Sequence, residues 1–156
     1  MKHKIFELAT IEDVPEILEI QHQAFAPQCK ALGWNDCLPL NETLDSAYED
    51  FGNFKTFKIQ NDDGKIIGSV RGHVTDGSLL IGHLVVHPDY QGQDLGKFLL
   101  REIQKCLPHN RAAIQMSYGF GYANHHSSQI EAVYPRNLVL SATMYTFAVS
   151  IINIRI

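Results

Sequence analysis

The sequence predicts a single domain, residues 1–156, of the α+β (mixed α/β) class, with a central, mostly antiparallel mixed sheet flanked by helices. Three observations support this prediction. The chain has 156 residues, about the length of one domain. Apolar residues make up 45% and charged residues 19%, which is typical of a globular protein and excludes a disordered one. The period of the hydrophobic residues also changes along the chain between that of helices and that of strands.

The first third of the chain is predicted to hold a short strand and two helices. Residues 4–9 (KIFELA) are typical of a strand, and the apolar side chains of residues 14–25 fall mostly on one helical face. Residues 26–39 are rich in helix breakers and predict a loop. A second helix is indicated by apolar side chains three and four residues apart, at Leu44, Ala47, Tyr48 and Phe51.

The middle of the chain predicts three strands joined by tight turns. Residues 54–60 (FKTFKIQ) and 65–74 (KIIGSVRGHV) are strand-like, and the DDGK sequence at residues 62–65 is typical of a hairpin turn. Asp-Gly at residues 76–77 marks a second turn. Residues 78–86 (SLLIGHLVV) are almost continuously apolar, which suits a central strand.

The last third begins with an amphipathic helix and ends in an apolar segment. Pro108 stops the helix, and residues 111–117 (RAAIQMS) predict another strand. Residues 138–156 are apolar apart from Arg155, but their polar and β-branched residues favour strands over a membrane helix. We interpret this tail as a strand segment whose apolar face is a candidate subunit interface in a homodimer.

Charge and cysteine content exclude several classes of protein. The net charge of −4 offers no basic surface for nucleic acid. Residues 1–14 contain acidic residues and no apolar run, so we expect no signal peptide, no membrane partner and a cytoplasmic location. Cys29, Cys37 and Cys106 form no CxxC motif, and we expect reduced thiols. His125 and His126 lack a third ligand at metal-like spacing, so no metal site is expected.

The turn in HPDYQGQDLGKFLL, residues 87–100, has the character of an anion site. The first turn of a helix has unpaired N–H groups and partial positive charge, which suit a pyrophosphate. Asp94 is unexpected there, because a carboxylate beside a phosphate costs about 1 kcal/mol in water-like surroundings and about 4 at a dielectric of 20. Alternatively, Asp94 is a helix N-cap that competes with the anion for the same donors.

The segment LVVHPDYQGQDLGKFLL resembles the acetyl-CoA-binding segment of the GNAT superfamily, the Gcn5-related N-acetyltransferases. The family pattern is Gln/Arg-x-x-Gly-x-Gly/Ala after a strand ending in Val-x-Pro. Here Gln91 to Gly96 fill that pattern, with Asp94 in place of the first glycine. ATIEDVPEILEIQHQAF and GKIIGSVRGHV are also similar to the family's first strand-to-helix passage and second hairpin. The resemblance covers about residues 4–107 and implies the GNAT acyltransferase fold.

The resemblance implies acetyl-CoA (coenzyme A) as co-substrate and an N-acetyltransferase reaction. An amine of a small molecule or peptide would attack the thioester directly. The strand residues Leu84, Val85 and Val86 would contact the pantetheine arm through their backbone. The pyrophosphate would lie on backbone N–H groups of the turn, which comprises Gln91, Gly92, Gln93, Asp94, Leu95, Gly96 and Lys97.

Two catalytic candidates follow from these placements. His83, on the strand predicted for residues 78–86, lies next to the backbone that would hold the thioester and titrates in a useful range, although a partly buried strand histidine is the alternative. The resemblance also implies a tyrosine that protonates the leaving thiolate, and Tyr134, seven residues after Ser127, occupies that spacing. Tyr118 is a weaker substitute. Further candidates that could face a substrate are His73 and Arg71.

The sequence does not identify the acceptor amine. Trp34 is either an aromatic wall of the acceptor site or a loop anchor, and the acidic residues that could attract an amine are Asp36, Glu42 and Asp45. A second function also stays open, namely a catalytically weakened GNAT-like protein that binds a ligand or a partner. Asp94, Pro135 and the absence of the family's Gly-Phe after Tyr134 support that second reading.

Overall fold

The computed structural model describes residues 4–31, 33, 35–114 and 138–139, which form both strands and helices. Along the chain these elements are β1 Ile5–Leu8, η1 Ile11–Asp13, α1 Val14–Ala31, α2 Leu38–Asn41, α3 Leu44–Asn53, β2 Lys55–Gln60, β3 Ile66–Thr75, β4 Ser78–Val86, η2 Pro88–Tyr90, α4 Leu95–Cys106, β5 Arg111–Ile114 and β6 Leu138–Val139.

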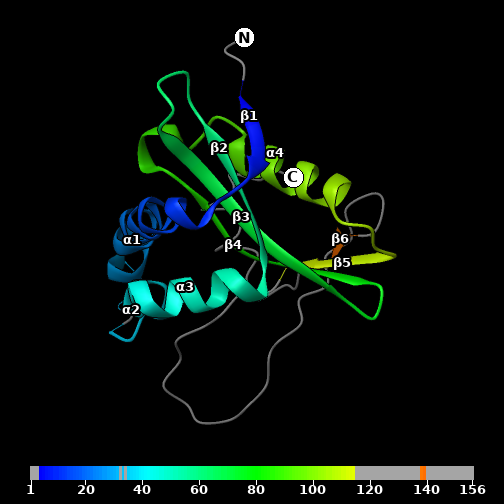
Figure 1. The fold of residues 1–156 in the computed structure, drawn as a ribbon. Coiled ribbons are helices and arrows are strands. Elements are labelled where there is room, and N and C mark those ends of the chain that lie inside the picture. Colours follow the sequence, from blue (N-terminus) through cyan, green and yellow to red (C-terminus); the bar gives the residue numbers. More distant parts are fainter. Residues whose placement is uncertain (1–3, 32, 34, 115–137, 140–156) are drawn as a thin grey trace.

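The strands form one mixed sheet in the order β1-β2-β3-β4-β5-β6. The pairs from β1 to β4 are antiparallel, whereas β4 pairs with β5, and β5 with β6, in parallel. Helices α1 and α3 cover one face of the sheet and α4 covers the other (Figure 1). The predicted fold, a mostly antiparallel mixed sheet flanked by helices, is therefore confirmed.

Helix α4 packs against the sheet through the apolar side predicted from its periodicity. Leu99 and Ile103 are fully buried in the larger hydrophobic core cluster, which lies between α4 and the sheet. Gly72 on β3 permits the close approach, because a Cβ there would lie 2.9 Å from the carbonyl oxygen of Leu80 and 3.2 Å from Ile103 Cδ1. On the opposite face, a smaller cluster joins α1 to β3 and β4 and comprises Ile20, Ala24, Ile66 and Val85.

The two predicted hairpin turns are confirmed by their backbone geometry. Gly64 in the β2–β3 turn has φ +77°, and both residues of the β3–β4 turn have positive φ, Asp76 at 50° and Gly77 at 71°. Two positive φ values in succession match the right-handed twist of the flanking strands.

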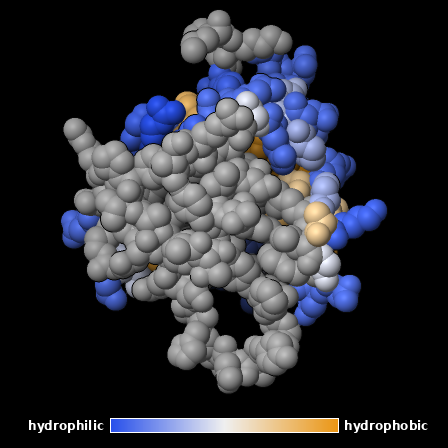
Figure 2. All heavy atoms as spheres, turned by 180° about the vertical axis from the view of Figure 1, so that it is seen from behind, coloured by the Kyte–Doolittle hydropathy of each residue, from blue (hydrophilic) through white to orange (hydrophobic). Residues whose placement is uncertain are grey.

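On the face that Figure 2 shows, the coloured residues are mainly polar. In Figure 2, which views the molecule from behind, most of the coloured atoms are hydrophilic, and small hydrophobic patches lie among them. None of the helices that the structure describes has the length and apolar character needed to cross a membrane. Of the predicted tail segment, residues 138–156, the structure describes only Leu138–Val139, as strand β6, and the predicted subunit interface otherwise lies outside the described residues.

The prediction of a loop over residues 26–39 is wrong at both ends. Helix α1 continues through Pro27 to Ala31, and residues 38–41 form the short helix α2. Cys29 lies in the last turns of α1, after Pro27, and is only 2% exposed. Tertiary packing therefore outweighs the low helix propensity of proline there.

The expectation of three reduced thiols is wrong for two of them. Cys29 at the end of α1 and Cys37 just before α2 form a disulfide, with Cα atoms 6.2 Å apart. The two cysteines are eight residues apart in the sequence, a spacing that matches no disulfide or metal-binding motif. They meet because α2 begins close to the end of α1. Cys106 is a free, exposed thiol.

Candidate functional site

A bulge in β4 determines where His83 points. On β3 one residue separates Ser69 from Arg71, but their partners on β4, Val85 and Gly82, are separated by two. The extra residue is accommodated at His83, whose φ of +45° lies in the left-handed region. Histidine adopts this region more readily than most residues with a Cβ. Bulges of this kind commonly redirect a side chain beside a functional site.

The bulge reverses the alternation of side chains along β4. Before it, Leu79 and Ile81 pack in the core cluster with α4; after it, Leu84 and Val86 do so. Without the extra residue, His83 would follow Leu79 and Ile81 onto the α4 face. Instead its ring lies on the opposite face, within hydrogen-bond distance of α1.

The His83 ring is held between an arginine and a glutamine. Nη2 of Arg71 on β3 lies 2.7 Å from His83 Nε2, and His83 Nδ1 lies 3.0 Å from Oε1 of Gln21 on α1. Because a guanidinium can only donate, Nε2 must accept, and the ring proton is on Nδ1 and points to Gln21. The contacts therefore assign one neutral tautomer of His83.

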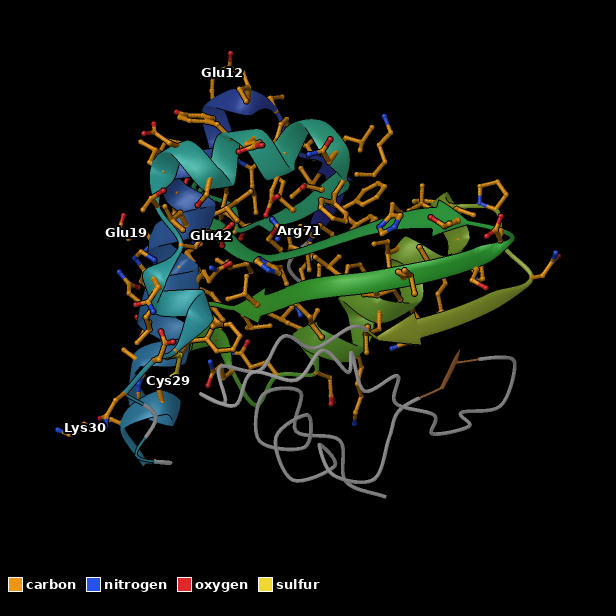
Figure 3. The ribbon with its side chains drawn as sticks, turned by 90° about the horizontal axis from the view of Figure 1, so that it is seen from below. Glu12, Glu19, Cys29, Lys30, Glu42 and Arg71 are labelled. Carbon is orange, nitrogen blue, oxygen red and sulfur yellow. A yellow bond between two sulfur atoms is a disulfide. The ribbon has the colours of Figure 1, made fainter. Side chains whose placement is uncertain are left out.

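The same network continues to two carboxylates. The amide of Gln21 donates to Glu42 Oε2 and, at 3.0 Å, to the Pro39 carbonyl oxygen. Arg71 donates to Asp50 Oδ2 at 3.1 Å, and its Nη1 lies 3.7 Å from Glu42 Oε1. Figure 3 shows Glu42 and Arg71 facing one another between the helices and the sheet.

Burial sets the protonation of the network. Loss of solvent, and then the positive charge of Arg71, lower the pKa of His83 to about 3. His83 is therefore neutral at neutral pH, and its one free lone pair is already engaged by Arg71. Burial also lowers the pKa of Arg71, against the opposing effect of Glu42 and Asp50.

A cavity of about 30 Å³ lies beside this network. Gln21, Glu42, Arg71 and His83 contribute polar groups to its wall. The rest of the wall comes from apolar and small polar residues of α1, α3, β2 and β3, namely Val14, Ile17, Leu18, Ala47, Phe51, Thr56 and Ser69. Of the three acidic residues considered from the sequence, Glu42 alone lines this cavity. Asp36 is hydrogen-bonded to Asn41, and Asp45 is exposed on α3.

The turn before α4 offers backbone donors instead of side chains. Gly92 and Asp94 have φ of +74° and +59°, and the first helical hydrogen bond runs from Phe98 N to Asp94 O at 3.0 Å. Within the described parts of the chain, no hydrogen bond uses the backbone N–H of residues 92–97. The Gln91 side chain anchors the turn by donating to Val86 O at 3.1 Å.

Asp94 does not compete for these donors. It occupies the N-cap position of α4 in a left-handed conformation, as the sequence suggested, but its side chain makes no capping hydrogen bond. Its carboxylate lies instead 3.0 Å from Lys97 Nζ. The alternative reading of Asp94 as a competing cap is therefore wrong, and its negative charge is partly balanced by a neighbour.

The end of β4 beside this turn has a free edge in the described structure. Strands β4 and β5 pair only between Ser78–Ile81 and Arg111–Ile114. Among the described residues, Leu84, Val85 and Val86 have no strand partner on the β5 side. Backbone groups on that edge are placed to pair with an extended ligand, as an added strand would.

The remaining predicted residues lie elsewhere. His73 stacks edge-on against Phe54 at 4.9 Å, and its buried Nδ1 has no hydrogen-bond partner in the described structure. Trp34, Tyr118, Tyr134, His125 and His126 lie outside the described residues.

The sequence reasoning missed Gln21 and Asp50. Gln21 is 3% exposed, on the same side of α1 as Ile17 and Ala24, and a polar residue in such an apolar stripe was an available signal. Asp50 has no comparable signal, because acidic residues are common on exposed helix faces.

Comparisons with known proteins agree with this architecture. An N-acetyltransferase described as uncharacterized, ycf52 of Gracilaria tenuistipitata var. liui, is 35% identical over 80 residues, which cover 51% of this chain and 43% of that protein. The match thus spans less than half of that relative's length.

Two solved structures share the fold. The PaiA N-acetyltransferase of Thermoplasma acidophilum, in complex with coenzyme A, superposes with a TM-score of 0.56 at 15% identity, over 75% of this chain and 82% of that one. A GNAT family acetyltransferase of Brucella melitensis, in complex with acetyl-CoA, gives a TM-score of 0.54 at 14% identity, over 93% and 99% of the two chains. At such identities the likeness shows the fold alone.

The family itself is shown by the sequence. The model of the acetyltransferase (GNAT) domain family matches residues 53–137, more than half of the chain, and this range includes β4, the turn and α4. The sheet order, the bulged β4 and the uncapped turn before α4 are consistent with that match. The chain therefore belongs to the GNAT acetyltransferase domain family.

Proposed function

We propose that this chain is an acetyl-CoA-dependent N-acetyltransferase that moves an acetyl group to a primary amine by direct attack. The observation that carries the proposal is the turn before α4, where the N–H groups of residues 92–97 make no hydrogen bond within the described structure. Such donors at a helix N-terminus bind a pyrophosphate. The free edge of Leu84 to Val86 lies beside them and suits the pantetheine arm.

The reaction needs one bond formed and one broken. The amine nitrogen attacks the thioester carbonyl carbon, the carbon–sulfur bond breaks, and the thiolate leaves with a proton. We propose Tyr134 as the donor of that proton, on the basis of its sequence position.

We assign His83 a positioning role. A histidine with a pKa of about 3 and an occupied lone pair is a weak proton acceptor at neutral pH. Its Nδ1–H orients Gln21, which in turn holds Glu42 and the carbonyl of Pro39.

Calorimetric titration with acetyl-CoA tests the cofactor site. We expect saturable binding by the wild type, and a loss of affinity of about tenfold or more for Gly92→Val, because valine resists the left-handed conformation. The matched control is Gly64→Val, which imposes the same strain at φ +77° in the distant β2–β3 turn and has no neighbour within 4 Å. It should bind normally. An absence of wild-type binding at millimolar acetyl-CoA would overturn the proposal.

A further inference from the structure

We propose that the β2–β3 hairpin holds the turn before α4 in its binding conformation, through a hydrogen bond from Asn61 to Tyr90. Both are then positioning residues for acetyl-CoA, although neither belongs to the turn itself. The inference rests on the proposed acetyl transfer and adds to it the part of the fold on which the affinity for the pyrophosphate depends.

The side-chain amide of Asn61, the residue directly after β2, has one orientation. Its Oδ1 accepts from the backbone N–H groups of Asp63, at 3.0 Å, and Lys65, at 2.9 Å. Because an amide oxygen accepts and an amide nitrogen donates, these two bonds determine which end of the amide faces the hairpin turn. Nδ2 is the other end, and it donates to the Tyr90 hydroxyl oxygen at 3.1 Å.

The hairpin around Asn61 is a rigid support for this donor. The Asn61 N–H donates to the Lys65 carbonyl oxygen, and the Gly64 N–H donates to the Asn61 carbonyl oxygen, both at 3.0 Å. Asparagine side chains commonly close turns by bonding the backbone that follows them. The backbone and side-chain polar groups of Asn61 are therefore all engaged, and its Nδ2 is held in place by β2 and β3 together.

Tyr90, the acceptor of this bond, lies two residues before Gly92 in the segment that joins β4 to α4. Its ring packs against the larger core cluster and stacks edge-on against His87, with ring centroids 5.6 Å apart. Among the described residues, the other hydrogen bonds of residues 88–94 stay within β4, this segment and α4. The bond from Asn61 is thus the one that ties the segment to a different part of the sheet.

The turn needs such support because its backbone is irregular. Gly92 and Asp94 both have positive φ, and the N–H groups of residues 92–97 make no hydrogen bond within the described structure. If the turn also populates other conformations, the apparent affinity for a ligand falls in proportion to the fraction that is competent to bind. Helix α4 holds one end of the turn, and Tyr90 holds the end that enters from β4.

Tyr90→Phe tests the bond with the smallest change, since it removes the hydroxyl group and keeps the ring in the core. We expect the Kd for acetyl-CoA, measured by calorimetry, to rise about fivefold, as the loss of one neutral hydrogen bond would produce. The matched control is Tyr48→Phe on α3, where the side chain is 37% exposed and far along the chain from the turn. It should bind like the wild type. Wild-type affinity in Tyr90→Phe would overturn the inference.

A double-mutant cycle tests whether the two residues act through their shared bond. Asn61→Ala removes the donor and also the bonds that close the hairpin turn, so the Kd should rise at least as much as in Tyr90→Phe. Adding Tyr90→Phe to Asn61→Ala should then have no further effect, because the partner is already missing. Effects that multiply in the double variant would overturn the inference.

A shortened ligand separates positioning of the turn from a general loss of stability. S-Acetylpantetheine carries the thioester and the pantetheine arm but no pyrophosphate, so Tyr90→Phe and the wild type should bind it equally, as measured by saturation-transfer NMR. Equal weakening of both ligands in Tyr90→Phe would overturn the inference alone. By contrast, no binding of acetyl-CoA by the wild type at millimolar concentration would overturn the proposed function, and the inference with it.

Discussion

The turn before α4 and the network around the cavity beside Glu42 arrange their polar groups in opposite ways. The turn uses backbone N–H groups of consecutive residues at an exposed helix end. The cavity uses side chains from α1, β3 and β4 and from the α2–α3 connection, each of which holds another. In the turn, a residue matters mainly for the φ it can adopt. In the cavity, each side chain is a partner that cannot be removed without leaving a buried group unpaired.

Asp94 and Arg71 illustrate the difference. Asp94 replaces a glycine of the family pattern, yet the turn keeps its left-handed conformation and its free donors. Arg71 contacts His83, Asp50 and Glu42 and also lies over the Phe54 ring, 5.0 Å from its centroid. A substitution in the turn should therefore change binding, whereas one in the network should change stability as well.

The largest expected effect is the loss of Arg71. Arg71→Met leaves Glu42 with no cation in a buried site, and we expect the free energy of unfolding to fall by about 3–5 kcal/mol. Urea denaturation measures it. Lys105→Met, which removes an exposed ion pair with Glu102, should cost less than about 1 kcal/mol. Similar losses in both variants would show that the buried network contributes no more than a surface pair.

A second prediction concerns the pH dependence of stability. The folded pKa of His83 is about 3, while an unfolded histidine titrates near 6.5. Between pH 6.5 and about 3, His83 binds a proton in the unfolded chain but stays neutral in the folded protein. His83 therefore lowers the free energy of unfolding by about 1.4 kcal/mol per pH unit as the pH falls toward 3.

His83→Gln removes this titrating group, so the free energy of unfolding should depend less on pH in the variant than in the wild type. Between pH 6.5 and 4.5 the wild type should lose about 2–3 kcal/mol more than the variant, as measured by urea unfolding at each pH. Other titrating groups are common to both proteins. Parallel slopes would mean that His83 accepts a proton in the folded state.

The smallest effect is expected in the turn. Asp94→Asn keeps a residue that tolerates the left-handed region but removes the charge. Acetyl-CoA should bind about fivefold more tightly, as about 1 kcal/mol of repulsion is lost, and the gain should shrink at high salt. Asp89→Asn, an exposed change in the preceding η2 turn, is the control and should have less effect. Unchanged affinity in Asp94→Asn would indicate that the ion pair with Lys97 already neutralises the carboxylate.

The same contrast explains what could be predicted from the sequence. The turn was recognisable because its chemistry is local: a strand, two glycines and a helix in succession define the donors. The hairpins were predictable for a similar reason, since Asp76 and Gly77 specify their own backbone geometry. The amphipathic period of α4 likewise identified the side that packs on Gly68 and Gly72.

The network could not be predicted, because its members meet only in the folded chain. Residues 78–86 read as one regular strand, and nothing in Gly82-His83 announces an extra residue. The sequence did not distinguish Glu42 from the other two acidic candidates, because its approach to Arg71 depends on how β3 packs against the helices. The disulfide of Cys29 and Cys37 was missed on the same grounds, since their approach depends on the path between α1 and α2.

The bulge at His83 also determines which change of length β4 tolerates. Because strand residues alternate between faces, a regular strand of the same sequence would turn Leu84 and Val86 away from the core beneath α4. The bulge absorbs one residue, so both side chains return to that core while the flanking segments stay paired with β3. Deletion of His83 alone should therefore leave a regular strand with Leu84 and Val86 still in the core, but with no histidine beside Gln21.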